Sequence, residues 1–364
     1  TEYYGAKKVN LQSFKKGYTT VRNHHVMKTR IPEIVTKSLP EFPVDHLSFS
    51  SVMKWHDDPV GFDRGYVHKQ WDFDTSPASV VGSAVHWGID RMINAVKRGE
   101  IPSVEAPEAL TLLQTEAVMK FDRAVKGEFL PGEDETRVTK IDWGKTGSPE
   151  KSRGDILTCS CNAIAAVRAY LAHWDIVATE VRFGNFDQSH IGVPLPVTTV
   201  SDAVAVKKDK TEARGVDWKT VGSISPTENV SDLDTWDANG KRRAQAGANY
   251  PAARKALDLA GFQSVPLVGA DFVEIHRGKG GASGVTSSTF FVPFEAGEKS
   301  AAVEIWAEMA RRAILGIFGA WFMPDLVAMP INLSSEYGGA DAFKALKEEL
   351  ANPDECLLTQ IPTA

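Results

Sequence analysis

Two aspartates and a lysine in strand-like segments have the types and spacing to bind a metal ion beside a phosphate. Asp202 lies in "GVPLPVTTVSDAVAVKK", and Asp217 and Lys219 lie in "TEARGVDWKTV". Side chains alternate along a strand, so Asp217 and Lys219 share one face while Trp218 points to the other. Carboxylate oxygens on rigid strands suit Mg²⁺ or Mn²⁺. The pattern therefore indicates a divalent cation site.

The turn between the two segments predicts their register. A hairpin that turns at Asp209 and Lys210 places Asp202 directly opposite Asp217, with Cβ atoms about 4.5–5.5 Å apart. Two carboxylates so close repel each other, unless one binds a proton or a cation neutralises both. Lys219 would relieve only part of this repulsion. The alternative is a surface hairpin whose carboxylates are solvated.

The segments around the hairpin predict a mixed α/β fold. Ser76 and Pro77 have the residue types that begin a helix, and apolar residues then recur at helical spacing. Further helices are expected over 155–174, 240–261 (interrupted at Pro251) and 298–322, and strands over 175–185, 192–208, 211–221, 265–277 and 288–294. This order predicts a central sheet flanked by helices.

The helix after Ser76 carries His86, four residues beyond Gly82. A glycine one turn away leaves room for a group to approach the imidazole. A histidine that simply packs at the boundary of the core is the alternative.

Composition limits the compartment and the partners. The net charge of −6 gives no general attraction to nucleic acid, so DNA binding would need a local basic groove. Three cysteines form no disulfide framework, which favours a reducing compartment and the cytoplasm (the host cytoplasm if the protein is viral). No secretory signal is visible, and the longest apolar run, 313–323, is too short to span a membrane.

Several more residues stand in a recurring order around the aspartates. Glu180 precedes them on a predicted strand, and Gln245 and Tyr250 follow them on a predicted helix. An opening segment, "LSFSSVMKWHDDPVGF", comes before the Gly82–His86 helix. Together with the Asp202…Asp217-Trp218-Lys219 set, these residues resemble the PD-(D/E)XK nucleases, most closely the RecB-like exonuclease branch, from about residue 45 to 325.

The resemblance implies a restriction-endonuclease-like core with a helical insertion. It suggests an N-terminal extension over 1–44, a nuclease domain over 45–340 with an insertion or lid over 100–150, and a C-terminal helix and tail over 341–364. Where the family has a cysteine before Pro-x-x-Phe this chain has Asp58, and the late cysteines of some relatives are absent. No iron–sulfur cluster is therefore expected.

The resemblance also implies Mg²⁺-dependent hydrolysis of DNA phosphodiester bonds, as in recombination and repair exonucleases of phage. Lys219 would position the attacking water or stabilise the phosphoryl charge, and Glu180 would complete or orient the site. The implied metal ligands are Asp202, Asp217, the Trp218 carbonyl and His86. The implied DNA contacts are Gln245, Tyr250, Lys241, Arg242 and Arg243.

Other functions and partners stay open at this point. A structure-specific endonuclease, or an inactive DNA-binding or structural protein, could use the same fold. No helicase motif is present, so a helicase or a single-strand annealing protein would be a separate partner. The chain could also form homo-oligomers.

Overall fold

The computed structural model describes residues 29–70, 74–128, 140–145, 147–222, 237–278 and 284–323. The chain divides into two compact units, Thr1–Arg30 and Ile31–Ala364. Residues 31–44, expected to belong to an N-terminal extension, are part of the second unit, where Val35, Phe42 and Val44 are buried. The expected C-terminal helix and tail, 341–364, lie outside the described residues.

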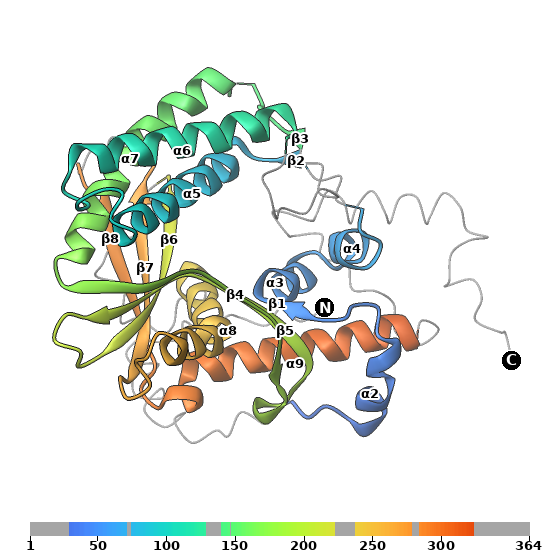
Figure 1. Cartoon of the computed structure of the whole chain (residues 1–364). Helices are drawn as coiled ribbons and strands as arrows, with labels where there is room; N and C mark the ends of the chain where they lie inside the picture. The colour runs from blue at the N-terminus through green and yellow to red at the C-terminus, as the bar shows by residue number, and fades with distance from the viewer. Residues whose placement is uncertain are drawn as a thin grey trace, which may run out of the picture. The chain divides into compact units, whose positions relative to one another are not determined.

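A mixed sheet forms the centre of the second unit (Figure 1). Three consecutive strands are antiparallel, the next pairs parallel to the third, and the last pairs antiparallel to its neighbour. The sheet in the described residues has six strands: β1 (Leu47–Ser48), β4 (Trp174–Gln188), β5 (Val193–Lys207), β6 (Ala213–Val221), β7 (Leu267–His276) and β8 (Ser287–Pro293). The predicted α/β class with a mixed central sheet is confirmed.

The register of the β5–β6 hairpin is the one that a turn at Asp209 and Lys210 predicts. Ala203 pairs with Val216, and the pairing continues without a shift to the turn. Lys210 takes a left-handed φ of 60°. The Asp209 carboxylate accepts hydrogen bonds from the backbone N–H and the hydroxyl of Thr211. These contacts fix the turn and hence the register.

Strand β5 changes its partner along its length. Ala203 is the last residue paired with β6, and farther back Val197 pairs in parallel with Leu47 of β1. Strand β6 meanwhile pairs with β7 as far as Val221. Because β5 follows β1 and β6 follows β7, the two strands separate beyond Ala203. We call this separation the fork.

Helices α5 (Pro77–Lys97), α6 (Pro107–Lys126) and α7 (Pro149–Leu171) form a layer on one face of the sheet (Figure 1). Helix α6 belongs to the segment expected to be an insertion or lid. Its apolar face, which includes Leu113 and Phe121, is fully buried in the same core cluster as α5, α7 and the sheet. This part of the segment is therefore integral to the core.

Helices α8 (Asp237–Leu259) and α9 (Ala301–Phe322) lie against the other face (Figure 1). The prediction that the first of them is interrupted at Pro251 is wrong, because α8 continues through it. Inside a helix, the ring of a proline crowds the carbonyl of the residue four positions earlier, which here is Gly247. A Cβ at Gly247 would lie 2.2 Å from the Ala302 carbonyl oxygen of α9. The close packing of α8 on α9 favours a continuous helix.

The segment before α5 begins with β1 and α3 (Phe49–Asp57), which Ser48 caps together with Ser51. Helix α3 ends before Pro59, and Asp58 then caps α4 (Pro59–Phe62) through the backbone N–H of Gly61. The remaining short elements are α2 (Glu33–Ser38), η2 (Leu39–Glu41), the π-helical turn η3 (Asp63–Val67), β2 (Asp74–Thr75), β3 (Lys140–Ile141), η4 (Ser189–Ile191) and η7 (Gly297–Lys299).

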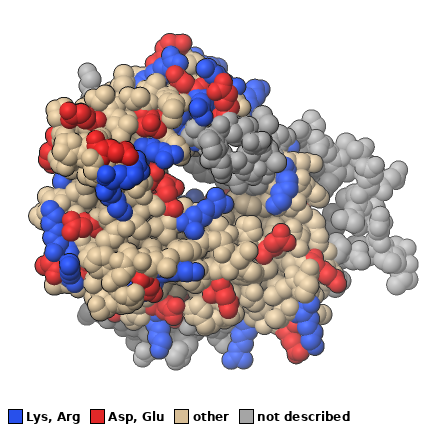
Figure 2. Space-filling view, viewed as in Figure 1, with Lys and Arg blue, Asp and Glu red and all other residues tan. Residues whose placement is uncertain are grey.

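The surface is hollowed between the layer of α5–α7 and the part of the unit that contains α3 and β5 (Figure 2). Both acidic and basic side chains lie along the rim of this cleft in the view of Figure 2. A helix long and apolar enough to cross a bilayer does not occur within the described ranges.

Candidate active site

Three carboxylates lie in a row across β4, β5 and β6 at the fork. The pairs Thr179–Ala203 and Val181–Ser201 place Glu180 beside Asp202. The Ala203–Val216 pair places Asp217 next to Asp202 on the other side. We call Glu180, Asp202 and Asp217 the acidic row. Three acids on adjacent strands repel one another, so the arrangement costs stability unless cations offset it.

Asp202 occupies the middle of the row, where the fork frees backbone groups of β6. Its Oδ2 accepts a hydrogen bond from the Trp218 N–H at 2.8 Å and lies 3.5 Å from His86 Nδ1. In an extended strand the N–H and C=O of one residue point to the same side. The Trp218 carbonyl, a predicted metal ligand, therefore also faces the fork. Burial raises the pKa of Asp202.

Asp217 is held by two neighbours. Lys219 Nζ lies 2.7 Å from its Oδ1 in an ion pair that lacks hydrogen-bond geometry, and Gln245 of α8 donates to its Oδ2 at 2.6 Å. The predicted common face of Asp217 and Lys219 is confirmed. Burial raises the pKa of Asp217 to about 6; Lys219 opposes this shift, and Asp202 adds to it.

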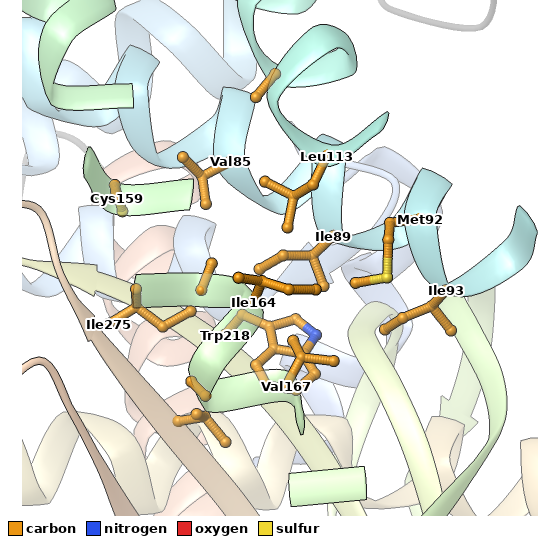
Figure 3. Close-up of a cluster of buried hydrophobic side chains, with 14 of the residues drawn as sticks. Val85, Ile89, Met92, Ile93, Leu113, Cys159, Ile164, Val167, Trp218 and Ile275 are labelled. Atoms are coloured by element: carbon orange, nitrogen blue, oxygen red, sulfur yellow. The ribbon is translucent and has the colours of Figure 1, made fainter. Parts of the chain in front are cut away.

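Trp218 fixes the orientation of this strand from the other side. Its ring is buried among side chains of α5 and α7, including Ile89 and Val167 (Figure 3). It meets the Tyr170 ring edge to face at a centroid distance of 5.9 Å. Because this indole is anchored in the core, the flanking Asp217 and Lys219 are directed away from α5 and α7.

His86 reaches the fork because α5 approaches β6 closely. A Cβ at Gly82 would lie 2.6 Å from Thr220 Oγ1. The space beside Gly82 is thus filled by Thr220, which corrects the expectation that it leaves room for a group to approach the imidazole. His86 Nε2 is buried without a hydrogen-bond partner. Burial, assisted by Lys219, lowers the pKa of His86 to about 4, so the imidazole is neutral near pH 7 and can act as a ligand.

Glu180 lies at the other end of the row with strained backbone. Its φ of 45° is left-handed, which is uncommon for a residue other than glycine and often marks a functional position. Burial raises its pKa to about 7; Asp202 and Asp90 add to this shift, and Lys120 opposes it.

Asp90 is a neighbour of the row that sequence analysis missed. Asn94 Nδ2 lies 2.8 Å from Asp90 Oδ1 and 2.9 Å from the hydroxyl oxygen of Thr179, the residue before Glu180. Asp90 follows His86 by four residues, so both lie on one stripe of α5. A carboxylate at this spacing from a candidate ligand was the signal that could have identified it.

The predicted DNA contacts fall into different environments. Gln245 lies in the site, on Asp217. Arg242 is paired with Glu274 and lies over the Phe290 ring, and Tyr250 is buried against the ring of Phe294. The structure thus gives these two residues packing roles. Lys241 is exposed and lies 3.4 Å from Asp57, and Arg243 is partly exposed.

The donor atoms at the fork fit a hydrated divalent cation. Within the described residues, no three His, Cys, Asp or Glu side chains converge as a complete ligand group. Asp202 and Asp217 nevertheless offer carboxylate oxygens near the imidazole of His86, whose Nδ1 lies 3.5 Å from Asp202 Oδ2. Mg²⁺ keeps several waters, so two carboxylates and few other ligands suffice.

No protein-family model and no curated protein matches this chain. The functional argument therefore depends on the geometry and chemistry of the fork.

Proposed function

We propose that this protein is a metal-dependent DNA nuclease that hydrolyses phosphodiester bonds at the fork. The observation that carries the proposal is the acidic row with Lys219 on Asp217 and His86 on Asp202. A row of carboxylates next to a lysine suits phosphoryl chemistry, because a cation can sit on the acids while the ammonium faces the phosphate. The order of the strands is compatible with the nuclease fold that the sequence resembles.

Asp202 and Asp217 would hold the cation, with the His86 imidazole and the Trp218 carbonyl as further ligands. A bound Mg²⁺ lowers the pKa of a water ligand and offsets charge on the phosphate. Lys219 stands at the same oxygen of Asp217 that the cation would use, so its ammonium is placed to hydrogen-bond the attacking water or a phosphoryl oxygen. Gln245 orients Asp217 from the opposite side.

We favour an exonuclease acting in recombination or repair, on the resemblance to the RecB-like branch. A structure-specific endonuclease would need the same residues, since the choice between ends and internal bonds depends on the channel and not on the fork. The substrate proposed in either case is DNA, bound in the cleft by local cations because the chain as a whole carries a net charge of −6.

The test is incubation with linear and covalently closed duplex DNA, in Mg²⁺ or in EDTA. Loss of linear DNA alone, only with Mg²⁺, is the result expected of an exonuclease, whereas nicked circles would indicate an endonuclease. Asp217→Asn should abolish cleavage, and Asp175→Asn, at an exposed aspartate of β4, should leave it unchanged. Cleavage in EDTA, or by Asp217→Asn, would refute the site, and no cleavage of any DNA would refute the function.

A further inference from the structure

The left-handed backbone of Glu180 must be held by its neighbours, because the Glu180 side chain is exposed. Thr179 and Val181, on either side of it, stay paired with Ala203 and Ser201 of β5. The left-handed φ of 45° is therefore confined to one residue inside an otherwise regular ladder. Such a conformation persists only where the surrounding contacts fix it.

Asn94 of α5 supplies such contacts at the residue before Glu180. Its Nδ2 lies 2.9 Å from the hydroxyl oxygen of Thr179, and its Oδ1 lies 3.2 Å from the same oxygen. Both side chains are partly buried, where a hydrogen bond is stronger than in water. The amide of Asn94 therefore ties strand β4 to helix α5 directly beside the strained residue.

Asp90 fixes the orientation of the Asn94 amide. Its Oδ1 lies 2.8 Å from Asn94 Nδ2, and a carboxylate only accepts hydrogen bonds, so the NH₂ group of the amide faces Asp90. His86, Asp90 and Asn94 follow one another at intervals of four residues and share one stripe of α5. The same helix thus contacts the middle of the acidic row through His86 and the residue before Glu180 through Asn94.

We propose that Asn94 is a positioning residue of the acidic row. Through Thr179 it holds the left-handed backbone of Glu180, and this conformation keeps the Glu180 carboxylate beside Asp202. Without Asn94, residue 180 can relax to the extended conformation that a glutamate prefers, and its carboxylate then turns away from the row. The consequence for cation binding depends on the proposed function, whereas the hold on Glu180 does not.

Crystal structures in EDTA test the hold on Glu180. In Asn94→Ala, and in Thr179→Val, which removes the hydroxyl but keeps the branched shape, residue 180 should change to a negative φ. Alanine suits a helix and valine a strand, so both variants should fold. Thr179→Ser keeps the hydroxyl and should keep the left-handed φ of the unaltered protein. A left-handed φ that persists in both Asn94→Ala and Thr179→Val would overturn the proposal.

Calorimetric titration with Mg²⁺ tests the consequence for the cation. Asn94→Ala should bind Mg²⁺ more weakly, on the order of tenfold, as is typical when a residue that orients a metal site is lost. In the Glu180→Gln background the same change should have no further effect, because Asn94 acts only through that carboxylate. The matched control is Lys97→Met, which should bind as the unaltered protein does. Lys97 also joins α5 to β4, but its Nζ contacts the carbonyl oxygen of Val177, at 3.1 Å.

The two experiments separate the hold on Glu180 from the proposed function. An Asn94→Ala protein that binds Mg²⁺ normally, or an equal loss of affinity in both backgrounds, would refute the role of Asn94 in cation binding. If the unaltered protein binds no Mg²⁺, the proposed function fails, and the crystal structures still decide whether Asn94 holds Glu180.

Discussion

The side chains of the acidic row sit in an environment that disfavours their charged forms. Burial is the largest cause of the raised pKa at Glu180, Asp202 and Asp217, and the neighbouring carboxylates add to it at Glu180 and Asp217. Strain at Glu180 and the unpartnered Nε2 of His86 occur at the same place. Shifted pKa values, backbone strain and unpartnered polar atoms that occur together in one region are typical of a functional site.

Cation affinity should depend on pH between 8 and 6. A proton competes with a cation for a carboxylate, and Glu180 (pKa about 7) and Asp217 (about 6) are ionised at pH 8 but take up protons toward pH 6. We expect the Mg²⁺ dissociation constant to rise as pH falls, by up to about tenfold per pH unit for each proton displaced. His86, with a pKa of about 4, stays neutral throughout this range.

Calorimetry at pH 8, 7 and 6 measures this dependence. The variant Glu180→Gln should show a weaker change between pH 8 and 7, because it removes the group with the higher pKa. An affinity that stays constant from pH 8 to pH 6 would contradict the assignment of these two carboxylates.

At the scale of helices and strands, close packing between neighbouring elements positions the side chains of the site. Gly82 lets α5 contact β6 at Thr220, which carries His86 to Asp202. Gly247 lets α8 contact the backbone of α9, one half-turn from Gln245. An added methyl group at Gly82 would separate two elements of the site, and one at Gly247 would push the helix that carries Gln245 away from α9.

Gly247→Ala should destabilise the protein by about 1–3 kcal/mol, since the added Cβ would overlap the Ala302 carbonyl oxygen. The matched control is Gly154→Ala on α7, where nothing lies within 4 Å of an added Cβ. That change should stabilise the protein by about 0.5–1 kcal/mol, because alanine is the better helix former. Urea unfolding of the two variants measures both values. A Gly247→Ala protein as stable as the unaltered one would show that α8 can move away from α9.

Local patterns predict part of this arrangement and miss the rest for a physical reason. The hairpin register follows from a turn of a few residues, and the common face of Asp217 and Lys219 follows from strand alternation, so both were predictable. The fork was not, because it depends on pairing between Leu47 and Val197, which are far apart in sequence.

At the scale of the whole unit, the proposed function requires DNA to approach a row of acids. The net charge of −6 gives DNA no general attraction, and in EDTA the acidic row would repel any phosphate that approaches it. Metal-free binding of DNA should therefore be weak, and removal of one acid should strengthen it.

We expect Asp202→Asn to bind a short labelled duplex in EDTA roughly threefold to tenfold more tightly than the unaltered protein, because one repelling charge is lost. Fluorescence anisotropy at low salt measures this, with Asp175→Asn as the control that should not differ. Equal or weaker binding by Asp202→Asn would indicate that DNA phosphates do not approach the fork.

Strand β5 pairs with three other strands, β1, β4 and β6, and this pairing restricts how the length of β5 can vary. Sliding it by a single position would disturb its ladders with β1, β4 and β6 together and would turn Asp202 away from both neighbouring acids. Insertions or deletions between 193 and 207 should therefore be poorly tolerated, and less well tolerated than insertions in the exposed turn at 208–211, which lies outside all three ladders.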